Sequence, residues 1–174
     1  MTIVAIVFSG ILFLLSLAFI PYRIIAAPCS AFLGLLVISM ARTPEGYPLL
    51  PLGSGLILGW LFMAVLVTVV TLCQPAPIRN MRKGMFYYLG GAVTGMALGL
   101  LGFTFLPGSG ARYVFMIVAI AVGTFLGALM YANTPEGKPV GIASGHFFRY
   151  LLAKGFPTAI TVMQLGTVLV VIGI

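Results

Sequence analysis

Two copies of one tetrapeptide hold every acidic side chain of this chain. The sequence Thr-Pro-Glu-Gly occupies residues 43–46 and returns at residues 134–137, so the two carboxylates are Glu45 and Glu136, and there is no Asp among the 174 residues. Ionisable groups inside a membrane are costly and persist where they are paired or functional. If the two copies enter the membrane, they predict a site for a proton or a cation.

The hydroxyl and imidazole groups near these two copies complete the candidate site. Each copy begins with a threonine, each is followed by a Ser-Gly pair, and the only histidine comes after the second pair. The candidate path for a substrate or an ion therefore consists of Glu45, Glu136, Thr43, Thr134, Ser54, Ser144 and His146. The simpler interpretation makes each serine a helix N-cap and the histidine an ordinary polar residue at the membrane interface.

Each Thr-Pro-Glu-Gly copy also has the composition of a β-turn, with proline in the second position and glycine in the fourth. As surface turns, the two copies would lie at opposite faces of the membrane. About 30 Å of hydrocarbon would then separate Glu45 from Glu136, so they would not share a ligand. The apolar stretches around the first copy are long enough to cross the membrane, which favours surface turns over loops that dip inward and meet.

Enzymatic chemistry has little support in the residue pattern. Cys29 and Cys73 form no CxxC pair, and the chain lacks a His-rich metal motif, a Gly-rich phosphate loop and a Ser-His pair at a recognisable spacing. We therefore assign no catalytic residue, no metal and no cofactor. Acid/base work on a lipid would need Glu45, Glu136 and His146 to converge.

The composition requires a membrane as the solvent for most of this protein. Hydrophobic residues make up 61% of the chain and charged residues only 6%, against roughly 25% charged residues in soluble domains. Six uncharged stretches approach the length of about 20 residues that a membrane-spanning helix needs. They cover residues 2–20, 24–41, 52–72, 85–106, 113–132 and 156–174, the last extended backward by residues 146–155. We predict an all-α polytopic membrane protein with six transmembrane helices.

The duplicated tetrapeptide divides this membrane domain, residues 1–174, into two repeats. Repeat one covers residues 1–73, a basic connecting loop covers residues 74–84, and repeat two covers residues 85–174. Three crossings in each repeat force the second copy to enter the membrane from the opposite side. The predicted architecture is a 3+3 inverted-topology internal repeat, with residues 24–41 folded back on residues 2–20 as an antiparallel hairpin.

The distribution of basic residues predicts the orientation of the chain. Under this topology one face receives Arg23, Arg79, Arg82, Lys83, Lys138, Arg149 and Lys154, and the other receives Arg42 and Arg112. By the positive-inside rule the face with seven is cytoplasmic. We expect a protein of the bacterial inner membrane with both termini on the non-cytoplasmic side. Basic residues scattered in this way do not form a nucleic-acid surface, although Arg79, Arg82 and Lys83 could also attract anionic lipid head groups.

Small residues and one proline predict how the helices pack and bend. Gly91, Gly95 and Gly99 recur every four residues and leave a groove in which another helix can approach closely. That helix belongs to the same chain or, alternatively, to a second copy in a homo-oligomer. Pro157 lies inside the last helical stretch, where loss of a backbone hydrogen bond favours a kink.

Three functions are compatible with these observations. The first is a small transporter or channel that carries an ion or compact solute between the two inverted repeats. The second is a non-catalytic accessory or substrate-binding subunit of a larger membrane complex, because polar side chains are scarce within the spans. The third is an intramembrane enzyme that acts on a lipid.

Overall fold

The structure is a computed structural model that describes residues 2–102 and 109–172. It is 81% helical, and the described residues form no β-strand. The backbone pairing of Arg42 with Pro48 is an isolated bridge in a connecting loop. The predicted all-helical class is therefore confirmed.

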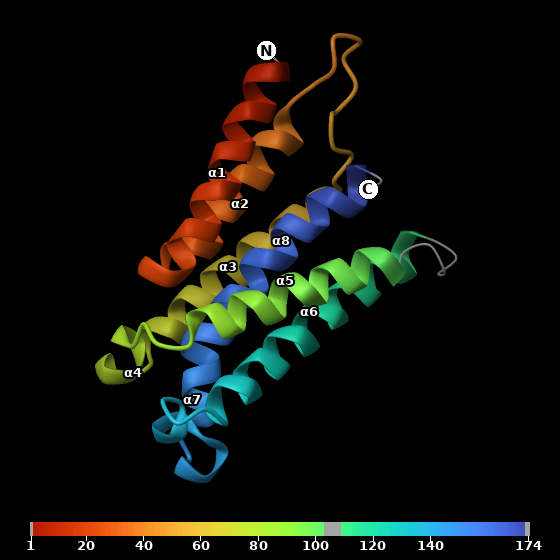
Figure 1. Cartoon of the computed structure of the whole chain (residues 1–174). Helices are drawn as coiled ribbons and strands as arrows, with labels where there is room; N and C mark the ends of the chain where they lie inside the picture. The colour runs from red at the N-terminus through yellow and green to blue at the C-terminus, as the bar shows by residue number, and fades with distance from the viewer. Residues whose placement is uncertain (1, 103–108, 173–174) are drawn as a thin grey trace.

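The helices follow one another along the chain with short connections (Figure 1). They are α1 (Thr2–Tyr22), α2 (Ala26–Met40), α3 (Ser54–Leu72), α4 (Ala76–Asn80), α5 (Met85–Leu101), α6 (Ser109–Ala132), the 3₁₀ turns η2 (Lys138–Val140) and η3 (Ile142–Ser144), α7 (Phe147–Tyr150), the π-helix η4 (Leu151–Gly155) and α8 (Phe156–Ile172). The predicted connecting loop thus contains a short helix, α4.

Four stretches of the described chain are long and apolar enough to cross a membrane: Thr2–Tyr22, Ser54–Leu72, Gly110–Ala132 and Phe147–Ile172. Helices α2 and α5 are apolar but have only 15 and 17 residues. At about 1.5 Å per residue they are shorter than a membrane core of roughly 30 Å. The described residues thus contain six apolar helices, and the part of the fourth predicted span beyond residue 102 lies outside them.

The bundle has two ends that differ in charge. Both termini lie at one end, together with the loop of residues 41–53, and we call it the terminal end (Figure 1). The connection between α1 and α2, the short helix α4 and the loop of residues 133–146 lie at the other, which we call the basic end. The seven basic residues predicted to share a face belong to these basic-end segments or to the α7–η4 segment next to them.

Helices α1 and α2 form the predicted antiparallel hairpin. The Ser9 hydroxyl donates to the carbonyl oxygen of Gly34 at 2.8 Å, and the Ser30 hydroxyl donates to that of Leu12 at 3.0 Å. These bonds join the two helices within their apolar length, where water is not available to satisfy a hydroxyl group.

Helices α5 and α6 form a second close pair. A Cβ atom added at Gly91 would collide with the carbonyl oxygen of Gly123, and one added at Gly123 would collide with that of Gly91. Gly95 lies in the same way against the backbone of Ala119. The backbones touch because these positions have no side chains. The partner of the glycine stripe in this structure is therefore another helix of the same chain.

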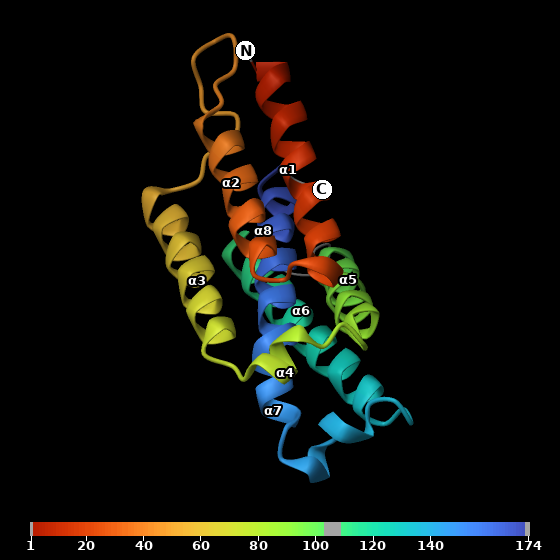
Figure 2. The same cartoon turned by 90° about the vertical axis from the view of Figure 1, so that its left-hand side faces the viewer.

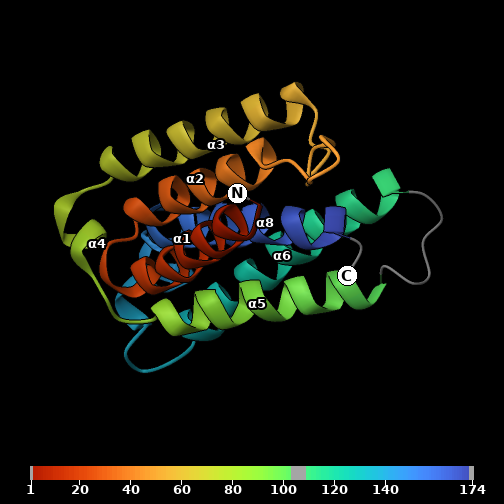
Figure 3. The same ribbon diagram turned by 90° about the horizontal axis from the view of Figure 1, so that it is seen from above.

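Helix α8 lies at the centre of the bundle (Figures 2 and 3). It contacts α1, α2 and α3 on one side and α5 and α6 on the other. In its membrane-length segment, Phe147–Ile172, 67% of the most apolar window is buried, against 22% for α3 at the edge of the bundle. A helix buried on all sides can carry polar groups that lipid would never contact, so α8 is where an internal site can be built.

The chain bends where it enters α8 (Figure 1). The helix α7, the π-helix η4 and the main part of α8 follow without a break, and Pro157 stands in the first turn of α8. Proline and π-bulges are two recognised causes of helix kinks. This explains why the predicted backward extension of the last span is present as a bent segment.

Candidate functional site

Both Thr-Pro-Glu-Gly copies are β-turns. The Gly46 N–H donates to the Thr43 carbonyl oxygen at 2.9 Å, and the Gly137 N–H donates to the Thr134 carbonyl oxygen at 3.1 Å. Gly46 has a φ of +88°, a backbone conformation that other residues rarely adopt. The tetrapeptides therefore fold as the turn interpretation predicted.

The two glutamates do not come together. Glu45 lies in the loop at the terminal end, whereas Glu136 lies in the loop at the basic end, and both are exposed. Glu136 forms an ion pair with Lys83 at 3.9 Å. The two carboxylates therefore lie at opposite ends of the bundle, as the surface-turn interpretation predicts, and not in the alternative arrangement in which both loops dip inward and share one site.

The motif threonines serve their own turns. The Thr134 hydroxyl donates to the carbonyl oxygen of Tyr131 at 2.7 Å and accepts from the Gly137 N–H at 3.1 Å. The Thr43 hydroxyl donates to the carbonyl oxygen of Tyr47 at 3.3 Å. Hydroxyl groups engaged in this way hold the local backbone and are not directed to a ligand.

The interpretation of Ser54 and Ser144 as helix N-caps is wrong. Helix α3 begins at Ser54 itself, with Gly53 in the capping position and no side-chain cap. Ser144 ends a 3₁₀ turn, where its hydroxyl donates to the carbonyl oxygen of Gly141 at 2.6 Å and accepts from the His146 N–H at 3.2 Å. His146 is exposed and precedes α7. Ser54 lies far from Ser144 and His146, because it is near the terminal end.

The bundle interior holds a row of polar residues that no motif in the sequence indicates. On α8, the side chains Thr158, Thr161, Gln164 and Thr167 recur every three residues, and all four are 0% exposed. Their spacing keeps consecutive members on neighbouring parts of the helix surface. We call them the α8 polar row. Because α8 contacts helices on both sides, this row lies inside the protein rather than against lipid.

Gln164 differs from the threonines of the α8 polar row. The hydroxyls of Thr158, Thr161 and Thr167 donate to the carbonyl oxygens of Lys154, Pro157 and Met163 at 2.7, 2.8 and 2.8 Å, so the threonines are satisfied by the backbone of the preceding turn. Neither amide atom of Gln164 has a partner in the structure. A buried polar group left unpaired costs about 1–3 kcal/mol. The amide is therefore available to bind a water molecule or a solute.

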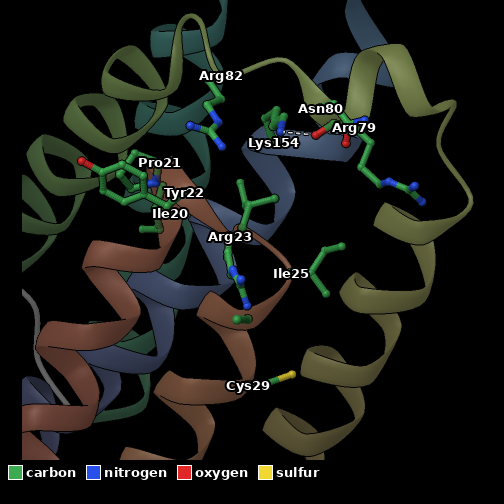
Figure 4. Close-up of a pocket in the computed structure, with 12 residues that line it drawn as sticks. Ile20, Pro21, Tyr22, Arg23, Ile25, Cys29, Arg79, Asn80, Arg82 and Lys154 are labelled. Carbon is green, nitrogen blue, oxygen red and sulfur yellow. Dashed lines mark hydrogen bonds between the residues drawn. The ribbon is translucent and has the colours of Figure 1, made fainter.

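A second feature lies at the basic end, where one pocket is lined by four basic residues (Figure 4). Its volume is about 570 Å³, and the residues that line it come from the α1–α2 turn, the α4 segment and η4. Four of them are Arg23, Arg79, Arg82 and Lys154, and no acidic residue lines it. We call it the cationic pocket. Segments far apart in the sequence build it, so no local motif indicates it.

Lys154 is the most buried of these four basic residues, with only 4% of its surface exposed. Its ammonium group donates to the carbonyl oxygen of Arg79 at 2.5 Å. The side chain of Arg79 extends away from the pocket toward α3 (Figure 4), where it donates to the Leu72 carbonyl oxygen at 3.3 Å. An ammonium group has three donors, so Lys154 has donors left for a ligand in the pocket.

Comparisons of this chain with known proteins identify no relative. The chain matches no protein-family model, no curated protein and no solved structure. Within the described residues, His, Cys, Asp and Glu form no group of three that could hold a metal ion. The site must therefore be interpreted from the α8 polar row and the cationic pocket themselves.

Proposed function

We propose that this protein is a small transporter that moves an ion or a compact solute between the two faces of the membrane along α8. The observation that carries the proposal is the unpaired amide of Gln164, fully buried at the centre of an apolar bundle. Apolar packing would fill this position at a lower cost. A polar solute that passes this position would supply the hydrogen-bond partners that the amide group lacks.

The order of the helices supports an inverted pair of halves as the framework. The first turn motif lies at the terminal end and the second at the basic end, as the 3+3 inverted repeat requires. Each half begins with a close helix pair, α1 with α2 and α5 with α6. The third helices differ, because α8 is central and α3 peripheral. In this proposal the two halves have diverged, and the third helix of the second half has become the path.

The burial of the α8 polar row favours a carrier over an open channel. A row of side chains with no exposed surface is closed at both ends in this conformation. Transport then requires a movement of α8 against its neighbours. The π-helix η4 and Pro157 provide a place where the helix can change direction, next to Lys154 and the cationic pocket.

Reconstitution into liposomes tests this proposal. Protons, potassium, chloride and inorganic phosphate serve as probes, and empty liposomes give the background. We expect flux of at least one probe in the wild type and loss of that flux in Gln164→Leu, which keeps the volume but removes the amide. The control is Thr71→Val, a fully buried residue of the peripheral helix α3 whose hydroxyl bonds only its own helix, and it should retain the flux.

Thiol labelling provides an independent measurement, because it does not depend on the choice of solute. In a background with Cys29→Ser and Cys73→Ser, a small membrane-impermeant reagent should modify Gln164→Cys but leave Val67→Cys, equally buried on α3, unmodified. Absence of labelling at position 164 together with absence of flux for all four probes would contradict transport. It would favour the accessory-subunit function, which co-purification of a partner complex then tests.

The positions of the three candidate acid/base residues do not support catalysis on a lipid. Glu45 lies at the opposite end of the bundle from Glu136 and His146, so the three do not form one site. A reaction that needs all of them together is therefore not proposed.

A further inference from the structure

We infer that the cationic pocket binds a phosphate-bearing anion, supplied either as the head group of an anionic phospholipid or as a soluble phosphate ester. The α1–α2 turn contributes Arg23, the segment after α3 contributes Arg79 and Arg82, and η4 contributes Lys154. This inference does not rest on transport, because a resident lipid, a regulatory anion and a transported solute would all use the same contacts.

The charge of the pocket is not neutralised within the chain. The sequence contains only two acidic residues, Glu45 and Glu136. Glu45 lies at the other end of the bundle, and Glu136 forms an exposed ion pair with Lys83. A buried cation without a counter-ion is strongly unfavourable. Lys154, with 4% exposure and a carbonyl oxygen as its hydrogen-bond partner, therefore lacks the anion that its position requires.

The arrangement of the basic side chains suits a phosphate group. In Figure 4, Arg82 and the ammonium group of Lys154 lie on the same side of the pocket, next to the α4 segment, whereas Arg23 extends from the α1–α2 turn along α2 toward Cys29. The planar fork of a guanidinium group matches the oxygens of phosphate, and lysine adds a compact charge. Both arginines are exposed, so their side chains can move to meet a ligand that enters from the membrane surface.

The size and the apolar lining of the pocket indicate more than an inorganic ion. A volume of about 570 Å³ is in the range that holds an organic ligand. Ile20, Ile24 and Ile25 line it together with the basic residues, so charge and apolar surface meet in one cavity. A phosphate ester satisfies both surfaces, because its oxygens would face the arginines and its glycerol or acyl part would face the isoleucines. Basic pockets between membrane helices bind lipid head groups in this manner.

Binding is measured on the full-length protein purified in a non-ionic detergent. Native mass spectrometry counts the phosphatidylglycerol molecules retained by each chain, with phosphatidylcholine as the comparison, since its ammonium group opposes a cationic wall. In parallel, thermal unfolding is followed with inorganic phosphate and with glycerol 3-phosphate. Retention of phosphatidylglycerol alone indicates a lipid ligand, and a rise in melting temperature with glycerol 3-phosphate indicates a soluble one. Either result supports the inference if it depends on the arginines.

The decisive variant is Arg23→Gln combined with Arg82→Gln. Both side chains are exposed, so their loss should leave the fold intact, as helical circular dichroism can verify. Removal of one charge-assisted hydrogen bond predicts about tenfold weaker binding for each arginine. The matched control, Lys138→Gln with Arg149→Gln, removes the same charge from exposed positions near the same end but outside the pocket. Equal weakening in both double variants, or no preference of the wild type for either phosphate probe, overturns the inference.

Discussion

At the scale of single residues, the two glutamates occupy similar turns but differ in their contacts. Glu136 pairs with Lys83 across 3.9 Å, with 66% and 69% of the two side chains exposed. Exposed pairs of this kind contribute less than about 1 kcal/mol. The ion pair therefore does little to hold the loop of residues 133–146 on the bundle. Hydrogen bonds of the turn itself, including the two made by the Thr134 hydroxyl, hold its local shape.

A first prediction follows from this comparison. We expect Glu136→Gln and Glu45→Gln each to lower the melting temperature by less than about 4 °C, because both side chains are exposed and loss of the exposed Glu136–Lys83 pair costs under about 1 kcal/mol. Liposome flux should be unchanged in both variants, since neither carboxylate lies on α8. Thermal unfolding in detergent and the flux assay check these outcomes. Loss of flux in either variant would contradict this prediction and would indicate that the substituted glutamate lies on the solute path.

At the scale of elements, the α5–α6 pair depends on backbone contact. Gly90 and Gly91 are neighbours in α5, but only Gly91 faces α6: a Cβ atom would meet the Gly123 backbone at Gly91 and open space at Gly90. A four-residue spacing of glycines is visible in the sequence. Its partner helix is not, because α3 also carries small residues four apart, Gly55 and Gly59, where a Cβ atom would meet nothing.

The second prediction uses this matched pair. Gly91→Ala should destabilise the protein by about 1–3 kcal/mol, because the helices must separate to admit the methyl group. Gly90→Ala should be neutral or slightly stabilising, since alanine is the better helix former. Thermal unfolding of both variants in the same detergent provides the comparison. Equal melting temperatures for the two would show that α5 and α6 are not in backbone contact at this position.

At the scale of the whole molecule, the charge asymmetry between the two ends predicts orientation in the membrane. Seven of the nine basic residues belong to the basic end and its adjoining segment, and the positive-inside rule assigns that end to the cytoplasm. The termini would then lie on the opposite side, with the cationic pocket open to the cytoplasmic leaflet. That leaflet is the one whose anionic lipids carry the phosphate groups proposed as ligands.

The third prediction tests this orientation with single cysteines in the background that lacks Cys29 and Cys73. Tyr47→Cys, exposed at the terminal end, should react with a membrane-impermeant maleimide in intact cells. Lys138→Cys, exposed at the basic end, should react only after the membrane is permeabilised. Tyr47 lies in the loop of residues 41–53 and Lys138 begins the short 3₁₀ turn η2, so neither change lies in a membrane-length helix. Reaction of both cysteines from the same side would contradict the topology on which the inverted arrangement depends.

The sequence by itself predicted a membrane protein with apolar helices, two β-turns and an uneven distribution of charge. These properties depend on composition and on residues a few positions apart, such as the Thr-Pro-Glu-Gly turns. The sequence favoured surface turns at opposite faces for Glu45 and Glu136 but left open one site shared by inward-dipping loops, because a repeated motif does not reveal how deep in the membrane each copy lies. The capping prediction is wrong for Ser54 because α3 begins one residue earlier than expected, and helix boundaries are uncertain by a residue. It is wrong for Ser144 because that residue ends a 3₁₀ turn and α7 begins only at Phe147.

Only the tertiary structure decided that α8 is central, that Gln164 is buried without a partner and that Arg23, Arg82 and Lys154 line one pocket. The α8 polar row and the apolar residues around it look ordinary in the sequence, where three threonines and one glutamine in a helix predict nothing special. Burial depends on which helices surround a segment, and a pocket depends on segments more than 50 residues apart meeting. Such contacts arise from the packing of the whole bundle.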